Sequence, residues 1–158
     1  MSNLSMIGWA HTLVSFAALA AGFLCLPSLV MRNGREGPIT IFLLLTLIAA
    51  LSGFLFPGFG IGHRIGVAAT IVATIGLAVR LIFASTSIGA RIGAASAVIC
   101  MFFLMFFTIS ESFRRLPPLQ QLAPTLSEPP FRIAQLVNLV VFLLLAVIAA
   151  KRAGRSPD

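Results

Sequence analysis

The sequence predicts an all-α membrane protein, a five-helix transmembrane bundle, on the basis of two observations. The 158 residues are 59% hydrophobic and only 9% charged, whereas soluble domains carry about 25% charged residues. Apolar stretches of roughly 20 residues recur along the chain, and each is long enough to cross a hydrocarbon layer of about 30 Å at 1.5 Å per residue. Little of the chain remains for a soluble domain, so residues 1–158 are predicted to form a single transmembrane domain.

Turn signals divide the chain into five predicted spans. Gly34, Gly37 and Pro38 follow the first span, and Pro57 with Gly58 ends the second. The spans run over residues 7–30, 39–56, 62–83, 88–109 and 133–150. Between the last two spans lies an outer loop, 110–132, which holds five of the nine prolines. These prolines predict extended or irregular structure with a short helical turn.

The basic residues predict that the N-terminus lies outside and the C-terminus in the cytoplasm. In this orientation the inner connections carry seven Lys and Arg residues and the outer ones four, in agreement with the positive-inside rule. The inner set is Arg32, Arg35, Arg80, Arg91, Lys151, Arg152 and Arg155, and the outer set is Arg64, Arg114, Arg115 and Arg132. No basic residue precedes the first apolar run, so we expect a retained helix rather than a cleaved signal peptide. The expected location is the bacterial inner (plasma) membrane.

Several function classes find no support in the sequence. The net charge of +7 comes from basic residues scattered in ones and twos, so we expect no nucleic-acid partner. Cys25 and Cys100 lie inside apolar runs without a ligand spacing, and neither is assigned a redox role. No serine, cysteine or lysine has a credible base beside it, so no catalytic residue is predicted. The FFLMFF stretch at 102–107 is apolar on every side and is expected to face lipid and neighbouring helices.

The polar residues of the spans gather near the outer leaflet. His11 lies one turn into the first span, His63 opens the third, and Glu111 closes the fourth. Gln135 and Asn138, three residues apart, share a face of the fifth span. Ionisable groups in a bilayer need a partner or water, so this convergence predicts a candidate site. We expect Arg64, Arg115, Gln135 and Asn138 to border it.

Three chemistries and one structural interpretation fit this candidate site. His11, His63 and Glu111 suit a transition metal such as zinc, iron or copper, and the two histidines also suit haem b. The third chemistry is a proton or quinone site, in which His63 titrates near neutral pH and Glu111 relays the proton. In the structural interpretation the histidines sit in the headgroup region, and Glu111 pairs with Arg114 or Arg115.

Three segments resemble a family of uncharacterised bacterial predicted integral membrane proteins. The segments are GWAHTLVSFAALAAG in the first span, FGIGH at the third, and IGAASAVICMFFLMFFTISESFRRLP across the fourth. The matching residues, within 8–118, are His11, Phe59, Gly60, His63, Glu111, Arg115, Leu116 and Pro117. The resemblance implies that His11, His63 and Glu111 belong together, and it implies no particular activity. The family often carries a His-Arg pair before its second helix, whereas MRNGREGPIT here has no histidine.

Two further functions remain open from the sequence. One is a structural or assembly subunit that packs against a larger membrane complex. Small residues at helical spacing, such as Gly89, Gly93 and Ala97, would also allow a homo-oligomer, although contact within one bundle is the simpler interpretation. The other is a small-solute transporter, which is disfavoured because no matching pair of interrupted spans indicates an inverted repeat.

Overall fold

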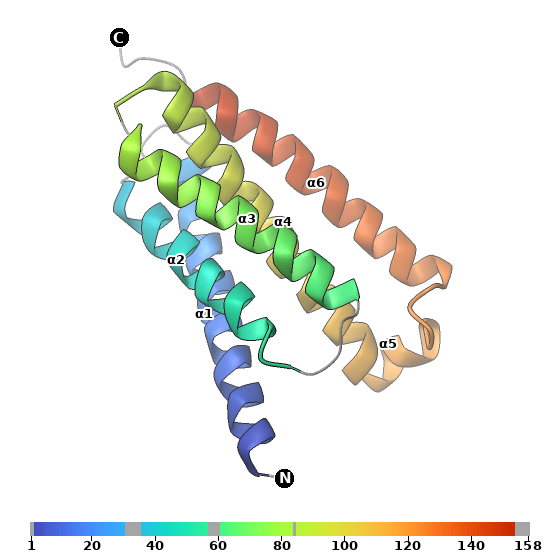
Figure 1. Cartoon of the computed structure of the whole chain (residues 1–158). Coiled ribbons are helices and arrows are strands. Elements are labelled where there is room, and N and C mark those ends of the chain that lie inside the picture. Colours follow the sequence, from blue (N-terminus) through green and yellow to red (C-terminus); the bar gives the residue numbers. More distant parts are fainter. Residues whose placement is uncertain (1, 31–35, 57–60, 84, 154–158) are drawn as a thin grey trace.

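Six helices make up the part of the chain that the structure describes, and no strand occurs among those residues. The computed structural model describes residues 2–30, 36–56, 61–83 and 85–153 (Figure 1). The helices are α1 (Ser2–Val30), α2 (Glu36–Gly53), α3 (Ile61–Ile82), α4 (Ser87–Arg115), α5 (Pro117–Leu122) and α6 (Pro129–Ala153). The predicted all-α class is therefore confirmed.

Four of these helices, α1, α3, α4 and α6, are long and apolar enough to cross a membrane. Large apolar side chains point outward from them, and Leu24, Leu81 and Ile82 are 80%, 76% and 70% exposed. A soluble protein would not leave such a shell in water, whereas lipid covers it without cost. The remaining apolar helix, α2, is shorter, because its 18 residues extend only about 27 Å.

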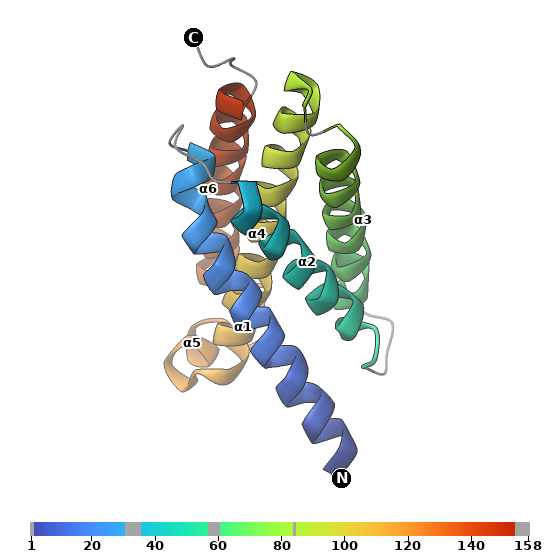
Figure 2. The ribbon, with the colours of Figure 1, turned by 90° about the vertical axis from the view of Figure 1, so that its left-hand side faces the viewer.

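The helices run between two opposite ends of the bundle. Figures 1 and 2 show that α1 begins at one end and α6 finishes at the other, with α2 running antiparallel to α1. We call the end where α1 begins the N-terminal end, and the end where α6 finishes the C-terminal end. The short α5 lies at the N-terminal end, beyond the last turn of α4.

Helix α4 is the central element of the bundle. In its most apolar stretch 44% of the residues are buried, against 22% in each of α1, α3 and α6. It packs against α3 and α6 along much of its length and meets α1 and α2 over a smaller area. The largest fully buried side chains come from α1, α2 and α4: Phe42, Leu43, Met101, Val98, Thr46, Cys25 and Cys100. Ala73 on α3 and Ala97 on α4 are also fully buried, so the small residues pack within this bundle.

Helix α1 is held close to its neighbours at one glycine. A Cβ atom on Gly22 would lie 2.8 Å from Cε2 of Phe42 and 3.1 Å from Cγ of Met101. The absence of a side chain at Gly22 therefore lets α1 approach both α2 and α4 at this level. Toward its N-terminus α1 leans away from α4 and α6 and stays beside α2 (Figure 2). The bundle is thus tightly packed near the C-terminal end and splayed near the N-terminal end.

The segment 110–132 is more helical than its prolines predict. Helix α4 continues to Arg115 instead of ending near Ile109, and α6 begins at Pro129. Pro117 ends α4 because it holds Leu116 in an extended conformation, at φ −89° and ψ 115°. Pro117, Pro118 and Pro129 then occupy first positions of the following helices. Proline suits these positions because the first amide groups of a helix need no intrahelical partner.

The turn before α6 is held together by a carboxylate. Thr125 donates from its hydroxyl (2.7 Å) and its amide (3.2 Å) to Oε1 of Glu128, and the Ser127 amide donates to Oε2 (3.0 Å). These hydrogen bonds, chiefly the one from the Thr125 side chain, lower the pKa of Glu128. Because they favour the charged form, the turn is more stable above the unfolded pKa of about 4.3.

We expect that stabilisation to be lost as the pH falls through the lowered pKa of Glu128. The amide chemical shifts of Thr125 and Ser127, followed by NMR in detergent, should titrate with a midpoint below about 4.3. The same titration should vanish in Glu128→Gln, which keeps the side-chain shape without the charge. A midpoint above the ordinary glutamate value would contradict this description of the turn.

Candidate functional site

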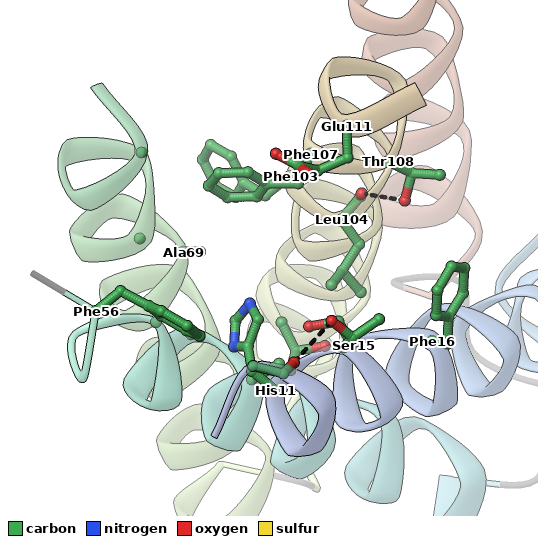
Figure 3. A pocket seen from close by; sticks show the side chains of 18 of the residues that line it. His11, Ser15, Phe16, Phe56, Ala69, Phe103, Leu104, Phe107, Thr108 and Glu111 are labelled. Atoms are coloured by element: carbon green, nitrogen blue, oxygen red, sulfur yellow. Dashed lines mark hydrogen bonds between the residues drawn. The ribbon is translucent and has the colours of Figure 1, made fainter. Parts of the chain in front are cut away.

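A cavity of about 790 Å³ lies in the splayed half of the bundle, between α1 and α4. Figure 3 shows His11, Ser15 and Phe16 on α1 facing Leu104, Thr108 and Glu111 on α4 across it. Helices α2 and α3 complete the wall, and α3 contributes the small residues Gly62, Gly66 and Ala69 as well as His63. The space arises because α1 diverges from α4 beyond Gly22 and α3 offers little side-chain volume to fill the gap.

Aromatic side chains form much of the cavity wall. Five phenylalanines line it, together with the only tryptophan of the chain: Phe16, Phe54, Phe56, Phe103, Phe107 and Trp9. Phe103 and Phe107 belong to the FFLMFF stretch that was expected to face lipid and neighbouring helices. Planar side chains of this kind pack against a ring through edge and face contacts. The cavity therefore suits a ligand that contains a planar ring.

His11 joins α1 to the end of α2 and also faces the cavity. Its Nδ1 lies 2.8 Å from Oγ of Ser52, and its ring meets the Phe56 ring edge-on, with centroids 5.2 Å apart. The Ser52 hydroxyl lies 2.8 Å from the Ala49 carbonyl and donates to it. Nε2 of His11 has no hydrogen-bond partner among the described residues. One ring nitrogen is thus fixed by the protein, and the other is available to a ligand.

His63 anchors the start of α3 to the same segment. Its Nε2 donates a hydrogen bond of 3.2 Å to the carbonyl oxygen of Phe56, and its ring lies 5.9 Å from that of Phe54. A carbonyl oxygen can only accept, so Nε2 carries the proton. Both histidines therefore hold the end of α2, His11 from α1 and His63 from α3.

Glu111 forms ion pairs with the arginines on the next turn of α4. Its Oε2 lies 2.8 Å from Nε of Arg115, and its Oε1 lies 3.5 Å from Nη1 of Arg114. These are the pairs that the structural interpretation of the sequence predicts. Glu111 lines the same cavity as His11. The last turns of α4, at one end of the cavity, therefore carry one negative charge and two positive charges.

The cavity brings together four of the predicted site residues. His11, His63, Glu111 and Arg115 all line it. The predicted bordering residues Arg64, Gln135 and Asn138 do not line it. Within residues 2–30, 36–56, 61–83 and 85–153, no group of three or more His, Cys, Asp or Glu side chains is arranged to hold a metal ion. Ligation of a metal or haem by His11 and His63 stays a prediction.

Gln135 and Asn138 serve the contact between α4 and α6 instead. The Gln135 amide donates to the Phe106 carbonyl (3.1 Å) and to Ser110 Oγ (3.2 Å), and Asn138 donates to the Phe102 carbonyl at 3.5 Å. Asn138 is buried at 6% exposure. The prediction that both share one face is correct, but this face turns toward α4 and does not line the cavity. Their depth in the span was predictable, whereas the direction of their helix face was not.

Two features of the site were missed from the sequence. Ser52 lies in an apolar run and belongs to no recognisable motif, although it fixes the orientation of His11. Phe103, Phe107, Glu111 and Arg115 are spaced four residues apart and therefore form one stripe along α4. That spacing was the available signal that the aromatic and charged residues share one face.

Comparisons of the chain with protein-family models, with curated proteins and with solved structures find no match.

Proposed function

We propose that this chain is a five-span protein of the bacterial inner membrane that binds a quinone-type amphiphile in the cavity between α1 and α4. The observation that carries the proposal is the combination of aromatic walls with the available Nε2 atom of His11 inside an apolar bundle. An apolar pocket with a few polar groups is the usual form of a small-molecule site. A volume of about 790 Å³ admits a substituted ring and the first part of an alkyl tail.

The arrangement of the polar groups favours this ligand over a metal ion. Nδ1 of His11 and Nε2 of His63 are both engaged with other parts of the protein, and the Glu111 carboxylate is engaged with two arginines. A metal would need all three side chains to give up these partners and move together. A planar ring needs only the existing space and one hydrogen bond to His11.

The rim of the cavity supports entry from the bilayer. Trp9 and Phe16 line the cavity and are also 70% and 59% exposed. In a membrane, these side chains lie between the lipid chains and the interior of the cavity. A ligand dissolved in the bilayer therefore reaches the site between α1 and α4, without passing through water.

The proposal can be tested with intrinsic fluorescence, because the chain contains one tryptophan and no tyrosine. Trp9 lines the cavity, so a 1,4-benzoquinone with a ten-carbon tail should quench its emission in a saturable manner. The matched control is the double variant Trp9→Phe/Ile75→Trp, which moves the fluorophore to an exposed position on α3 that does not line the cavity. This control should show only the linear quenching caused by quinone dissolved in the micelle. Linear quenching of Trp9 as well would contradict the proposal.

The five-span topology makes a separate prediction about the two membrane faces. Thr86 lies in the connection from α3 to α4, and Ser127 lies between α5 and α6, at the opposite end of the bundle. Arg80, Arg91, Lys151 and Arg152 occupy the Thr86 end, which favours a cytoplasmic location. In intact cells an impermeant thiol reagent should label Ser127→Cys and spare Thr86→Cys.

The native cysteines give little background in this labelling experiment, because Cys25 and Cys100 are buried. Cells made permeable before labelling serve as the control, in which both introduced cysteines should react. Labelling of Thr86→Cys in intact cells would reverse the proposed orientation. Equal labelling of both sites in intact cells would exclude the proposed placement of the helices.

A further inference from the structure

We infer that the cavity selects the reduced, hydroxyl-bearing form of its ligand, a quinol, over the quinone with its two carbonyl groups. This inference rests on the proposed function and concerns the same site. It follows from which polar atoms face the cavity as hydrogen-bond acceptors and which face it as donors.

Four of the five hydroxyl groups of the cavity wall direct their protons away from the ligand space. Each donates to the carbonyl four residues earlier in its own helix, at 2.8 to 2.9 Å. The pairs are Thr12 with Gly8, Thr46 with Phe42, Thr108 with Leu104, and Ser112 with Thr108. A hydroxyl group has one proton, so these oxygens offer only lone pairs to a ligand. Ser15, the other hydroxyl-bearing residue of the wall, can rotate its proton to suit either form.

His11 is also fixed as an acceptor toward the cavity. The Ser52 proton is donated to the Ala49 carbonyl, so Ser52 Oγ receives its second hydrogen bond from Nδ1–H of His11. Neutral imidazole has one N–H, so Nε2 then presents a lone pair. In the opposite tautomer Ser52 would donate to Nδ1 and lose its bond to Ala49. An unpaired N–H would then face an apolar cavity, which is the costlier arrangement.

The donors of the site are engaged elsewhere or belong to Trp9 and Arg115, which are exposed at its rim. The Nε2–H group of His63 is directed to the Phe56 carbonyl, and Nε–H of Arg115 is directed to Glu111. The Arg115 side chain is 79% exposed at the end of the cavity. A ligand hydroxyl inside the cavity therefore finds acceptors, chiefly Nε2 of His11. A ligand carbonyl oxygen beside Nε2 of His11 would meet a lone pair and would gain no hydrogen bond there.

The test compares three ligands that share one ring and one ten-carbon tail: the hydroquinone, the quinone and the dimethyl ether of the hydroquinone. Saturable quenching of Trp9 measures quinone affinity directly, and displacement of the quinone under anaerobic conditions measures the other two. One hydrogen bond of ordinary net strength makes the hydroquinone bind about tenfold more tightly than the diether. The quinone, which also lacks a donor, should bind about as weakly as the diether.

Two variants test the source of the preference. His11→Phe keeps an aromatic ring and removes Nε2, so the hydroquinone and the diether should bind with equal affinity. Ser52→Ala leaves Nε2 in place but no longer fixes the tautomer. Because Ser52 is a positioning residue, this change should reduce the hydroquinone preference while the affinity for the diether stays unchanged. Gel filtration in detergent verifies that both variants remain folded.

The outcomes separate the inference from the proposed function. Saturable binding of all three ligands with equal affinity by the unaltered protein overturns the inference and leaves the quinone-type site standing. Linear quenching by the quinone, with no displacement by the other two ligands, overturns the proposed function itself. A preference that persists in His11→Phe also overturns the inference, because it assigns the selectivity to another group.

Discussion

Replacing Gly89 with alanine is expected to prevent stable folding of the protein. A Cβ atom at this position would lie 2.0 Å from the carbonyl oxygen of Phe83 and 2.8 Å from its carbonyl carbon. That oxygen also accepts hydrogen bonds from the amide and the hydroxyl of Thr86, which caps the start of α4. Backbone atoms cannot move aside as a flexible side chain can, so the whole connection from α3 to α4 would have to shift. We expect a loss of more than about 3 kcal/mol of stability.

The buried cysteines provide the measurement for this prediction. Cys25 and Cys100 are inaccessible in the folded bundle, so a thiol-reactive fluorophore should report unfolding during heating in detergent. The matched control is Gly66→Ala, whose Cβ would meet its nearest neighbour, Cζ of Phe54, at an ordinary 3.8 Å. This control should unfold near the temperature of the unaltered protein. A Gly89→Ala variant as stable as the control would show that the backbone between α3 and α4 does not approach Gly89 as described.

Filling the cavity is expected to produce the largest loss of ligand binding. Ala50 lies on α2 and lines the cavity, so the phenyl group of Ala50→Phe has room to enter without displacing the core. It would then occupy the space in which we place the ligand ring. We expect the affinity for the tailed benzoquinone, measured by Trp9 quenching, to fall by more than about tenfold, because ring contacts of about 1.4 kcal/mol or more are lost.

The control for this variant adds the same phenyl group on the lipid-facing side of the bundle. Ala20 on α1 is exposed and does not line the cavity. It lies four residues before the exposed Leu24 and therefore on the same outward face of the helix. Ala20→Phe should bind the quinone as the unaltered protein does, since it makes the same change in side-chain size away from the site. Unchanged binding by Ala50→Phe would place the ligand elsewhere on the protein.

Depth in the membrane was predictable from the sequence, whereas the direction of each helix face was not. Counting residues at 1.5 Å per residue correctly places His11, His63 and Glu111 at one end of the bundle. The rotation of each helix about its axis depends on which small residues permit close approach, as Gly22 does for α1. For this reason Gln135 was assigned to the site, although it lies between α4 and α6.

The local chemistry of charged and proline residues was also only partly predictable. Pairing of Glu111 with Arg115 followed from their spacing, because residues four apart meet on a helix surface. The helical start at Pro129 was not recognised, since proline is read first as a residue that interrupts helices. A proline ends a helix that precedes it but suits the first turn of a helix that follows it. The proline content of the segment does not tell which of the two applies at Pro129.

The splay of α1 links the cavity to the bilayer around it. This helix has 29 residues and is about 44 Å long, while the hydrocarbon layer is about 30 Å thick. A helix longer than its bilayer tilts to keep its apolar surface covered, and it tilts further when the bilayer is thinner. Gly22 fixes α1 against its neighbours and His11 holds its N-terminal half to the end of α2, so a change of tilt moves that half and the end of α2 together. Under the proposed function, hydrophobic mismatch acts on the distance between α1 and α4, and bilayer thickness becomes a determinant of how readily the cavity admits a ligand.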